Sequence, residues 1–410
     1  MNYDLLIRGG RLIDPANDLD GDYDVAILDG LIAAVGPRLE VTAAAVFNAA
    51  GKIVCPGLID LHMHGYNLVT PLGIDTDHYC LGRGVTMAVD AGSAGASTFP
   101  GFRAYAAGPA KTRLVAFLHI STVGLAAAGL GGTTAPGELD LLSLADVESC
   151  VKSVEANRDL IVGVKIRLSE SICDSGRTEA ASLERARDAA DRVRAPLMIH
   201  HTISSVPLAD CLAKLRAGDI YTHCMHGFQS TSIDRQTRKV QDVTKRARER
   251  GILFDIGHGQ GSFNWTVADI WASEGFWPDT ISSDMHSGTC EGPCYDLPTV
   301  MTKLLHVGMP LSRVIEAATS RPAQAIGWQD RAGSLAVGRE ADVSVLELAD
   351  VDLDLEDCQS QMRRIRQRIV PAAVWRAGAP QAITQPKVFP NPETIEAQRT
   401  WQPLLHIRDV

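Results

Sequence analysis

The amino-acid sequence predicts an α/β protein: a (β/α)8 TIM barrel with a small β-sandwich domain built from both ends of the chain. In the central part, apolar runs typical of buried strands alternate with stretches of helical period. The flanking segments contain short strand-like runs instead. The first strand of the central part ends in histidines, whereas a doubly wound sheet usually has a nucleotide-binding loop there. We therefore expect a barrel at 55–331, a composite β domain at 1–54 and 332–390, and a C-terminal tail at 391–410.

The barrel prediction depends on eight apolar runs and the helical stretches between them. The runs lie near 58–62, 86–90, 114–120, 161–167, 197–200, 220–223, 252–255 and 280–284. The clearest helical stretches lie at 142–155, 180–193, 208–215, 240–250 and 298–306, with a last helix near 311–318. Strands that alternate with helices over about 250 residues are typical of a TIM barrel.

The two ends of the chain have β character. Apolar runs at 24–28 and 31–35 flank Asp29-Gly30, which is a strong signal for a hairpin. Strand-like sequence returns at 333–346 and near 372–375. Residues beyond Gln385 are rich in proline and offer little core.

Composition excludes several classes of function. The 410 residues carry a formal net charge of −10, and the basic runs at 235–250 and 363–368 are interpreted as solvated helix faces, so we expect no nucleic-acid partner. Nine scattered cysteines suit a reducing compartment. We find no export signal and no apolar run long enough for a membrane span. These features favour a cytoplasmic enzyme without a membrane partner, acting on a small molecule; the sequence leaves a homo-oligomer open.

The first predicted barrel strand ends in Asp60-Leu-His62-Met-His64-Gly. Alternate side chains of a strand share a face, so His62 and His64 point the same way and could clamp a metal ion. A His-x-His pair alone is weak evidence, because histidine is often a satisfied polar residue of the core.

Lys165 and Arg167 share one face of the fourth strand, and the apolar residues between them share the other. The apolar face suits the outer helices, so Lys165 is expected to point into the barrel mouth. A buried lysine is costly unless it is paired or modified. Two interpretations follow: a salt bridge to a barrel carboxylate, or carbamylation by CO2, which turns the cation into an anion able to bridge two metals.

Further candidate ligands close other strands, namely His200, His223 and Asp284. Barrel enzymes place their functional residues at such strand ends. Imidazole and carboxylate ligands suit Zn²⁺, with Mn²⁺, Fe²⁺ or Co²⁺ as alternatives.

These residues resemble the pattern of the amidohydrolase superfamily of metal-dependent hydrolases. The resemblance spans roughly residues 3–380, from Pro56-Gly-Leu-Ile-Asp-Leu-His62-Met-His64 to Gly333-Ser-Leu-Ala-Val-Gly-Arg-Glu-Ala-Asp342. Within the superfamily the chain looks like the deacetylases often mislabelled dihydroorotase or adenine deaminase. The matching runs are Gly163-Val-Lys165-Ile-Arg167, Thr222-His223-Cys-Met-His226-Gly, Phe254-Asp-Ile-Gly-His258-Gly, Ile281-Ser-Ser-Asp284 and Asp296-Leu-Pro-Thr.

The resemblance implies two divalent metal ions, with Zn²⁺ as the expected ion. It implies one ion on His62, His64 and Asp284, a second on His200 and His223, and a CO2-derived carbamate on Lys165 bridging both. It leaves the roles of His201 and His226 undefined.

Three further residues are candidate substrate contacts. Arg167 could hold a substrate carboxylate or form a structural ion pair. His258 lies between glycines after the seventh strand, and His286 is expected at the rim of the site. His119 is expected either behind the metal site or packed in the core. A glycine- and alanine-rich stretch at 124–134 predicts a mobile loop over the mouth.

The function expected from these residues is hydrolysis of an acyl amide or ester of a small carboxylic acid. A hydroxide bridging the metals attacks the carbonyl, and Asp284 serves as general base and then acid. The first alternative is a cyclic amide hydrolase resembling dihydroorotase or hydantoinase. A deaminase is disfavoured because the deaminases of the superfamily that the chain resembles mostly use one metal and no bridging lysine, whereas Lys165 is present. The remaining alternative is a non-catalytic scaffold on the same barrel.

Overall fold

The computed structural model describes residues 2–127 and 137–400. Of the loop predicted at 124–134, residues 124–127 form a 3-10 turn, and the rest lies outside the described residues. None of the described helices has the length and apolar character needed to cross a lipid bilayer.

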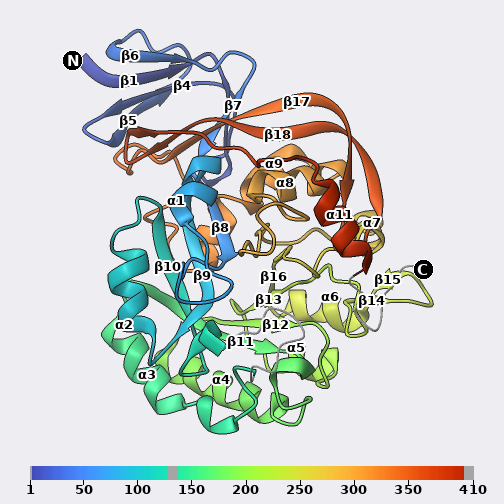
Figure 1. The fold of residues 1–410 in the computed structure, drawn as a ribbon. Helices are drawn as coiled ribbons and strands as arrows, with labels where there is room; N and C mark the ends of the chain where they lie inside the picture. Colours follow the sequence, from blue (N-terminus) through green and yellow to red (C-terminus); the bar gives the residue numbers. More distant parts are fainter. Residues whose placement is uncertain (1, 128–136, 401–410) are drawn as a thin grey trace.

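A curled parallel sheet forms the centre of the molecule (Figure 1). Its seven strands confirm the first seven strands predicted for the barrel. In order across the sheet they are β8 (Leu58–Met63), β9 (Val85–Gly95), β10 (Arg113–His119), β11 (Ile161–Leu168), β12 (Leu197–His201), β13 (Ile220–Thr222) and β16 (Leu253–Phe254).

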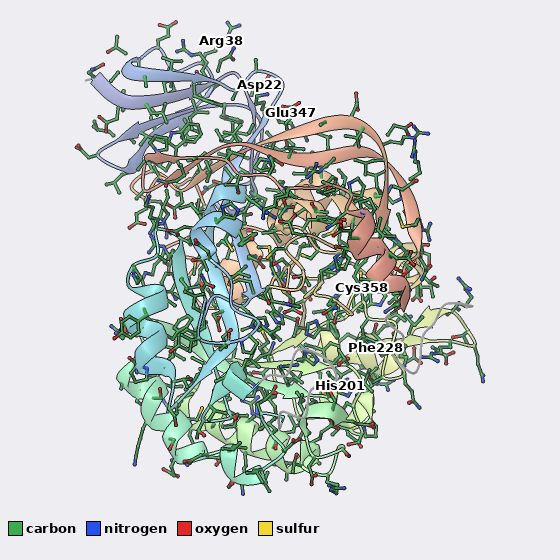
Figure 2. The ribbon with its side chains drawn as sticks, in the orientation of Figure 1. Asp22, Arg38, His201, Phe228, Glu347 and Cys358 are labelled. Carbon is green, nitrogen blue, oxygen red and sulfur yellow. The ribbon has the colours of Figure 1, made fainter. Side chains whose placement is uncertain are left out.

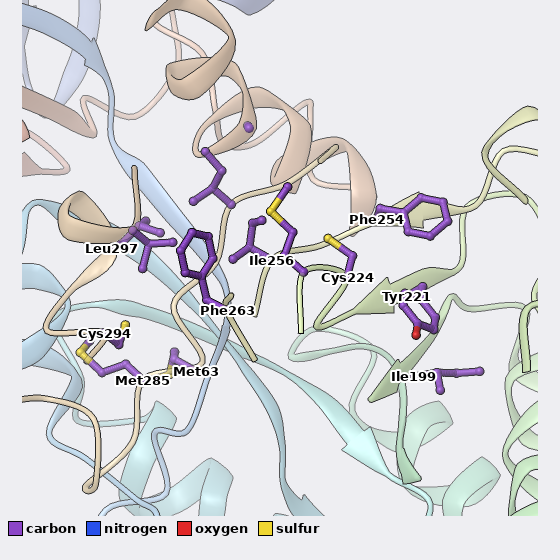
Figure 3. Packing of buried hydrophobic residues seen from close by; sticks show 14 of the residues in the cluster. Met63, Ile199, Tyr221, Cys224, Phe254, Ile256, Phe263, Met285, Cys294 and Leu297 are labelled. Carbon is purple, nitrogen blue, oxygen red and sulfur yellow. The ribbon is translucent and has the colours of Figure 1, made fainter. Parts of the chain in front are cut away.

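The eighth predicted strand, at 280–284, is not a regular strand. Isolated parallel bridges join Thr280 to Asp255 and Met285 to Met63, so this segment contacts both edges of the sheet. Figure 3 shows Met63 and Met285 side by side in the packed interior. Asp284 has a left-handed backbone (φ 46°), which interrupts an extended ladder at this point.

Helices cover the outside of the sheet and confirm the predicted helical stretches, although 142–144 forms a 3-10 turn before α3. The structure also has helices at 76–79, 99–101, 265–273, 320–325 and 392–400, which were not predicted. The helices are α1 (Thr76–Tyr79), α2 (Phe99–Gly101), α3 (Val147–Ala156), α4 (Glu179–Val193), α5 (Leu208–Ala213), α6 (Asp242–Glu249), α7 (Trp265–Ser273), α8 (Leu297–His306), α9 (Leu311–Ala317), α10 (Ser320–Ala325) and α11 (Pro392–Thr400).

Two cores hold the barrel together. Val164 and Ile166 of β11 pack in the large outer cluster with Leu183 and Ala186 of α4. A second cluster takes side chains from β8 through β13 and from 323–328, so the barrel is a packed core and not a channel.

Both ends of the chain contribute to two further sheets, which share a third core that includes Ile7, Val25, Val54, Val343 and Trp375. The first sheet has the order β5 (Leu31–Gly36), β4 (Asp24–Leu28), β1 (Asn2–Arg8), β6 (Thr42–Asn48). The second has the order β19 (Ala379–Gln381), β18 (Met362–Arg376), β17 (Val343–Glu356), β7 (Ile53–Pro56), β2 (Arg11–Asp14), β3 (Leu19–Asp22). A small hairpin pairs β14 (Ile233–Asp234) with β15 (Lys239–Val240).

The structure corrects the interpretation of the basic run at 363–368. This run lies in β18 and not on a helix, and Arg364 forms an ion pair with Asp352 of β17 (2.5 Å). Every second residue of a strand shares a face, so Ile365 and Ile369 are buried while Arg366 faces solvent. The run at 235–250 is divided between the β14–β15 hairpin and α6. The predicted tail also differs, because it contains α11.

Candidate metal centre

His62, His64 and Asp284 form a buried cluster whose ligand atoms lie within 4.8 Å of one another. The Nε2 atoms of His62 and His64 lie 3.2 and 3.1 Å from Oδ1 of Asp284. Their Nδ1 atoms form hydrogen bonds with the hydroxyls of Thr222 and Ser93, both at 3.0 Å. Each imidazole is therefore held from behind with Nε2 turned toward the carboxylate.

Lys165 points into the same site, as predicted from the alternation of β11. Its side chain is fully buried, and Nζ lies 3.3 Å from Nε2 of His62 and 3.4 Å from Sδ of Met198. Among the described residues no carboxylate forms an ion pair with it, so the salt-bridge interpretation is not realised. Burial lowers the pKa of Lys165 to about 7.

His200 and His223 bring two more imidazoles to the site, with ring centroids 4.2 Å apart. Nδ1 of His223 donates to the carbonyl of Gly257 (2.6 Å), and Nε2 of His200 contacts the Thr202 hydroxyl (2.9 Å). Burial, reinforced by neighbouring imidazoles and cations, lowers the pKa of both rings well below the usual range. Both histidines are therefore neutral near pH 7, which is the form that binds a metal.

This donor set fits divalent metal ions. Nε2 of His223 is buried and has no hydrogen-bond partner in the described structure, which is costly for a polar atom unless a ligand completes it. Imidazole and carboxylate donors in this number are those that zinc prefers in proteins.

Two of these residues have unusual backbones. His223 (φ 66°) and Asp284 (φ 46°) adopt the left-handed region. The site also requires glycine at 259, because a Cβ atom there would lie 2.3 Å from Oδ2 of Asp284. Such strain persists where the surrounding structure fixes the residue, and it is typical of functional sites.

Buried carboxylates that the sequence analysis did not assign a role support the strand ends. Asp60 accepts hydrogen bonds from the backbone N–H (2.9 Å) and the hydroxyl of Ser283. Asp255 accepts from Thr222 (2.7 Å), which in turn holds His62. Burial raises the pKa of Asp60 to about 7. The signal for these residues was present: a carboxylate on or at the end of an otherwise apolar strand.

A cavity of about 250 Å³ opens above the cluster. Arg167 lines it, yet also pairs with the buried carboxylate of Glu138 (3.0 Å), with 19% of its side chain exposed. Arg167 therefore forms the structural ion pair and also lies on the cavity wall, where its substrate contact stays a prediction. The remaining lining residues include His286 and the apolar Leu72, Ile203 and Phe228.

The other histidines lie outside the cavity lining. His258 is fully buried and bonds to Lys303 (2.8 Å). His201 bonds to Tyr221 (3.1 Å), and His226 stacks on Phe228. His119 lies beside Lys165 on the neighbouring strand β10, with its Nε2 3.9 Å from Glu138.

Comparison with known proteins places the chain in a family. The model of the Amidohydrolase family matches residues 53–380. A deacetylase of Agrobacterium fabrum is 35% identical over 344 residues, which cover 84% of this chain and 82% of that protein. A deacetylase of Brucella anthropi is 33% identical over 91% of this chain and 90% of its own length.

Solved structures agree. The structure of a dihydroorotase superposes with a TM-score of 0.85 at 31% identity, covering 94% of this chain and 99% of its own. The structure of an adenine deaminase superposes with a TM-score of 0.84 at 31% identity, covering 93% of this chain and 100% of its own. These matches extend over nearly the whole chain and include both the barrel and the terminal sheets. The chain therefore belongs to the amidohydrolase family of hydrolases.

Proposed function

We propose that this protein is a binuclear, metal-dependent deacylase that acts on an acyl amide or ester of a small carboxylic acid. One observation carries the proposal: a buried lysine, three of the candidate imidazole ligands and a carboxylate line a single cavity beside an arginine, and the fourth imidazole, that of His223, packs against the ring of His200. The similarity to proteins named deacetylase, over most of the chain, supports it.

The buried cluster suits two divalent cations. One ion would be held by His62, His64 and Asp284, and the other by His200 and His223. A carbamate on Lys165 would bind both ions. Bound Zn²⁺ would polarise the substrate carbonyl and lower the pKa of water. The carbamate forms when neutral Nζ of Lys165 attacks the carbon of CO2 and loses a proton, which leaves an anion. A pKa near 7 makes the neutral amine available for this step.

Asp284 is the residue placed to move a proton. Burial alone would raise the pKa of Asp284, but the imidazoles of His62, His64 and His223 lower it well below its usual range. Its carboxylate is thus ionised, which is the form that a general base requires. Passing that proton to the leaving group completes acid–base catalysis.

Arg167 is the residue proposed to select the substrate. A guanidinium at the cavity wall can hold a carboxylate through two parallel hydrogen bonds. N-acyl amino acids and O-acyl hydroxy acids meet this requirement. So does dihydroorotate, a cyclic amide with a carboxylate, and the overall similarity to a solved dihydroorotase makes ring opening the second candidate.

A substrate panel with a metal analysis tests the proposal. We expect about two equivalents of divalent metal, hydrolysis of at least one acylated acid, and a carbamate resonance after incubation with carbon-13-labelled bicarbonate. The Asp284→Asn protein, purified in the same way, controls for contaminating hydrolases. Turnover of dihydroorotate or a hydantoin, with no activity on any acylated acid, would favour the second candidate.

A further inference from the structure

Lys303 is a buried cation outside the cavity. It lies on α8, has no exposed surface, and donates to three acceptors: Nε2 of His258 (2.8 Å), the carbonyl of Pro293 (2.8 Å) and the carbonyl of Glu356 (2.7 Å). Three acceptors use all three protons of an ammonium group. This is a fully satisfied group whose partners come from three separate segments of the chain.

The contact with Lys303 fixes the state of His258. Because Nε2 accepts from the ammonium, the ring proton is on Nδ1, and Nδ1 donates to the carbonyl of Gly259 (3.0 Å). The ring also stacks on Phe263, with centroids 5.0 Å apart and planes 13° apart. His258 is therefore held in one orientation and in turn holds the backbone at 259.

That backbone lies directly against Asp284. The N–H groups of His258 and Gly259 donate to the carbonyls of Ser282 (3.2 Å) and Ser283 (2.9 Å). A Cβ atom at 259 would lie 2.3 Å from Oδ2 of Asp284, so the loop backbone supports the side of the carboxylate that does not contact the histidines. A shift of this loop would displace Asp284.

The turn between β17 and β18, residues 357–361, anchors the same loop. This hairpin runs from the N-terminal sheets to the barrel, and Figure 2 labels Cys358 at its far end. The N–H of Cys358 donates to the carbonyl of Phe263 (3.0 Å), and the amide of Gln359 donates to the carbonyl of Gly261 (3.3 Å), which lines the cavity. The loop is thus held from α8 and from the hairpin.

We infer that Lys303 is a positioning residue for the reaction: it holds Asp284 in place through His258 and Gly259. The inference rests on the proton-transfer role of Asp284 proposed above. It assigns a function to His258 that differs from the substrate contact expected from the sequence.

The Lys303→Met variant, in full-length protein, tests this inference by hydrogen–deuterium exchange and by kinetics. We expect faster exchange in peptides covering 257–263 and 282–286. We also expect kcat to fall on the order of 10- to 100-fold, with KM changed less than about 3-fold, as is typical when the support of a ligand is removed. The Arg187→Met variant is the matched control, because it removes another buried cation, paired with Asp219 before β13. It should destabilise the protein without changing exchange at 282–286.

Unchanged exchange at 282–286 in Lys303→Met would overturn the inference, whatever the substrate proves to be. Faster exchange there with an unchanged kcat would instead contradict the proton-transfer role of Asp284.

If Lys303→Met does not fold, two variants at 258 replace it. His258→Gln keeps an acceptor for Lys303 and a donor for Gly259 and should behave like wild type, whereas His258→Phe keeps only the stacking and should show faster exchange. Equal exchange in the two variants would overturn the inference.

Discussion

Two buried basic residues at opposite ends of the barrel strands differ in whether a carboxylate pairs with them. Before β13, Arg187 pairs with Asp219, and Asp219 also accepts from the backbone of Leu197 (2.7 Å) and Arg216 (2.7 Å). At the opposite, carboxyl ends, Lys165 is buried, and no carboxylate within 2–127 or 137–400 forms an ion pair with it. Breaking the Arg187–Asp219 pair at the amino ends would leave a buried charge unpaired and destabilise the fold, whereas Lys165 at the carboxyl ends keeps an amine that a ligand can use.

The largest expected effect is on catalysis at the carboxyl ends. Asp284→Asn keeps an oxygen that can bind a metal but removes the group that accepts a proton. We expect kcat to fall by about 10²- to 10⁴-fold with most of the metal retained. Steady-state kinetics and elemental analysis measure the two quantities. A near-normal kcat in protein with full metal content would exclude Asp284 from proton transfer.

The next prediction compares the two ends directly through stability. In metal-free protein kept free of CO2, Lys165→Met should raise the free energy of unfolding at pH 7, because an apolar side chain replaces a buried amine. Arg187→Met should lower it by about 3 kcal/mol, because it leaves a buried carboxylate unpaired. Urea unfolding of both variants checks the opposite signs.

The pH dependence of the Lys165 effect follows from its pKa of about 7 in the folded state, against 10.5 when unperturbed. Between these values the unfolded chain binds more protons at Lys165, so the contribution of Lys165 to wild-type stability should rise with pH, by about 5 kcal/mol over the whole interval. Lys165→Met lacks this contribution, so its advantage should shrink as pH rises from 7 toward 10. Parallel pH profiles for the two proteins would contradict the unpaired state of Lys165.

The smallest effect concerns substrate binding. Arg167→Met removes a charge-assisted contact that contributes roughly 1.5–3 kcal/mol, so KM for an acylated acid should rise about 10-fold or more. KM for the corresponding methyl ester should change little. Equal losses on the charged and the neutral substrate would mean that Arg167 serves only its ion pair with Glu138.

The sequence was sufficient to predict most of the barrel strands and the candidate metal ligands at their carboxyl ends. Strand periodicity decides which side chains share a face, so Lys165 could be assigned to the barrel mouth, whereas His200 and His223 were assigned to the same site because each closes a predicted strand. Contacts between distant segments could not be predicted in this way. Lys303 occupies an ordinary buried position of α8, and nothing local to it indicates His258, 45 residues away.

Two local patterns misled the prediction for physical reasons. The arginine-rich run of β18 resembles a solvated helix face, and its strand character depends on cross-strand pairing with acidic residues of β17. The segment at 280–284 has the composition of a strand, but the left-handed backbone at Asp284 allows only isolated bridges.

That backbone also limits how the site can change by mutation. At φ 46° a β-branched or bulky side chain is strained, whereas asparagine and aspartate tolerate the conformation and glycine adopts it freely. A saturation library at position 284 should therefore yield few well-folded members, and glutamate, although it keeps the charge, should be poorly represented among active clones. Substrate range in this protein is then expected to diversify through the cavity walls, while the side chain at 284 stays fixed by the main chain beneath it.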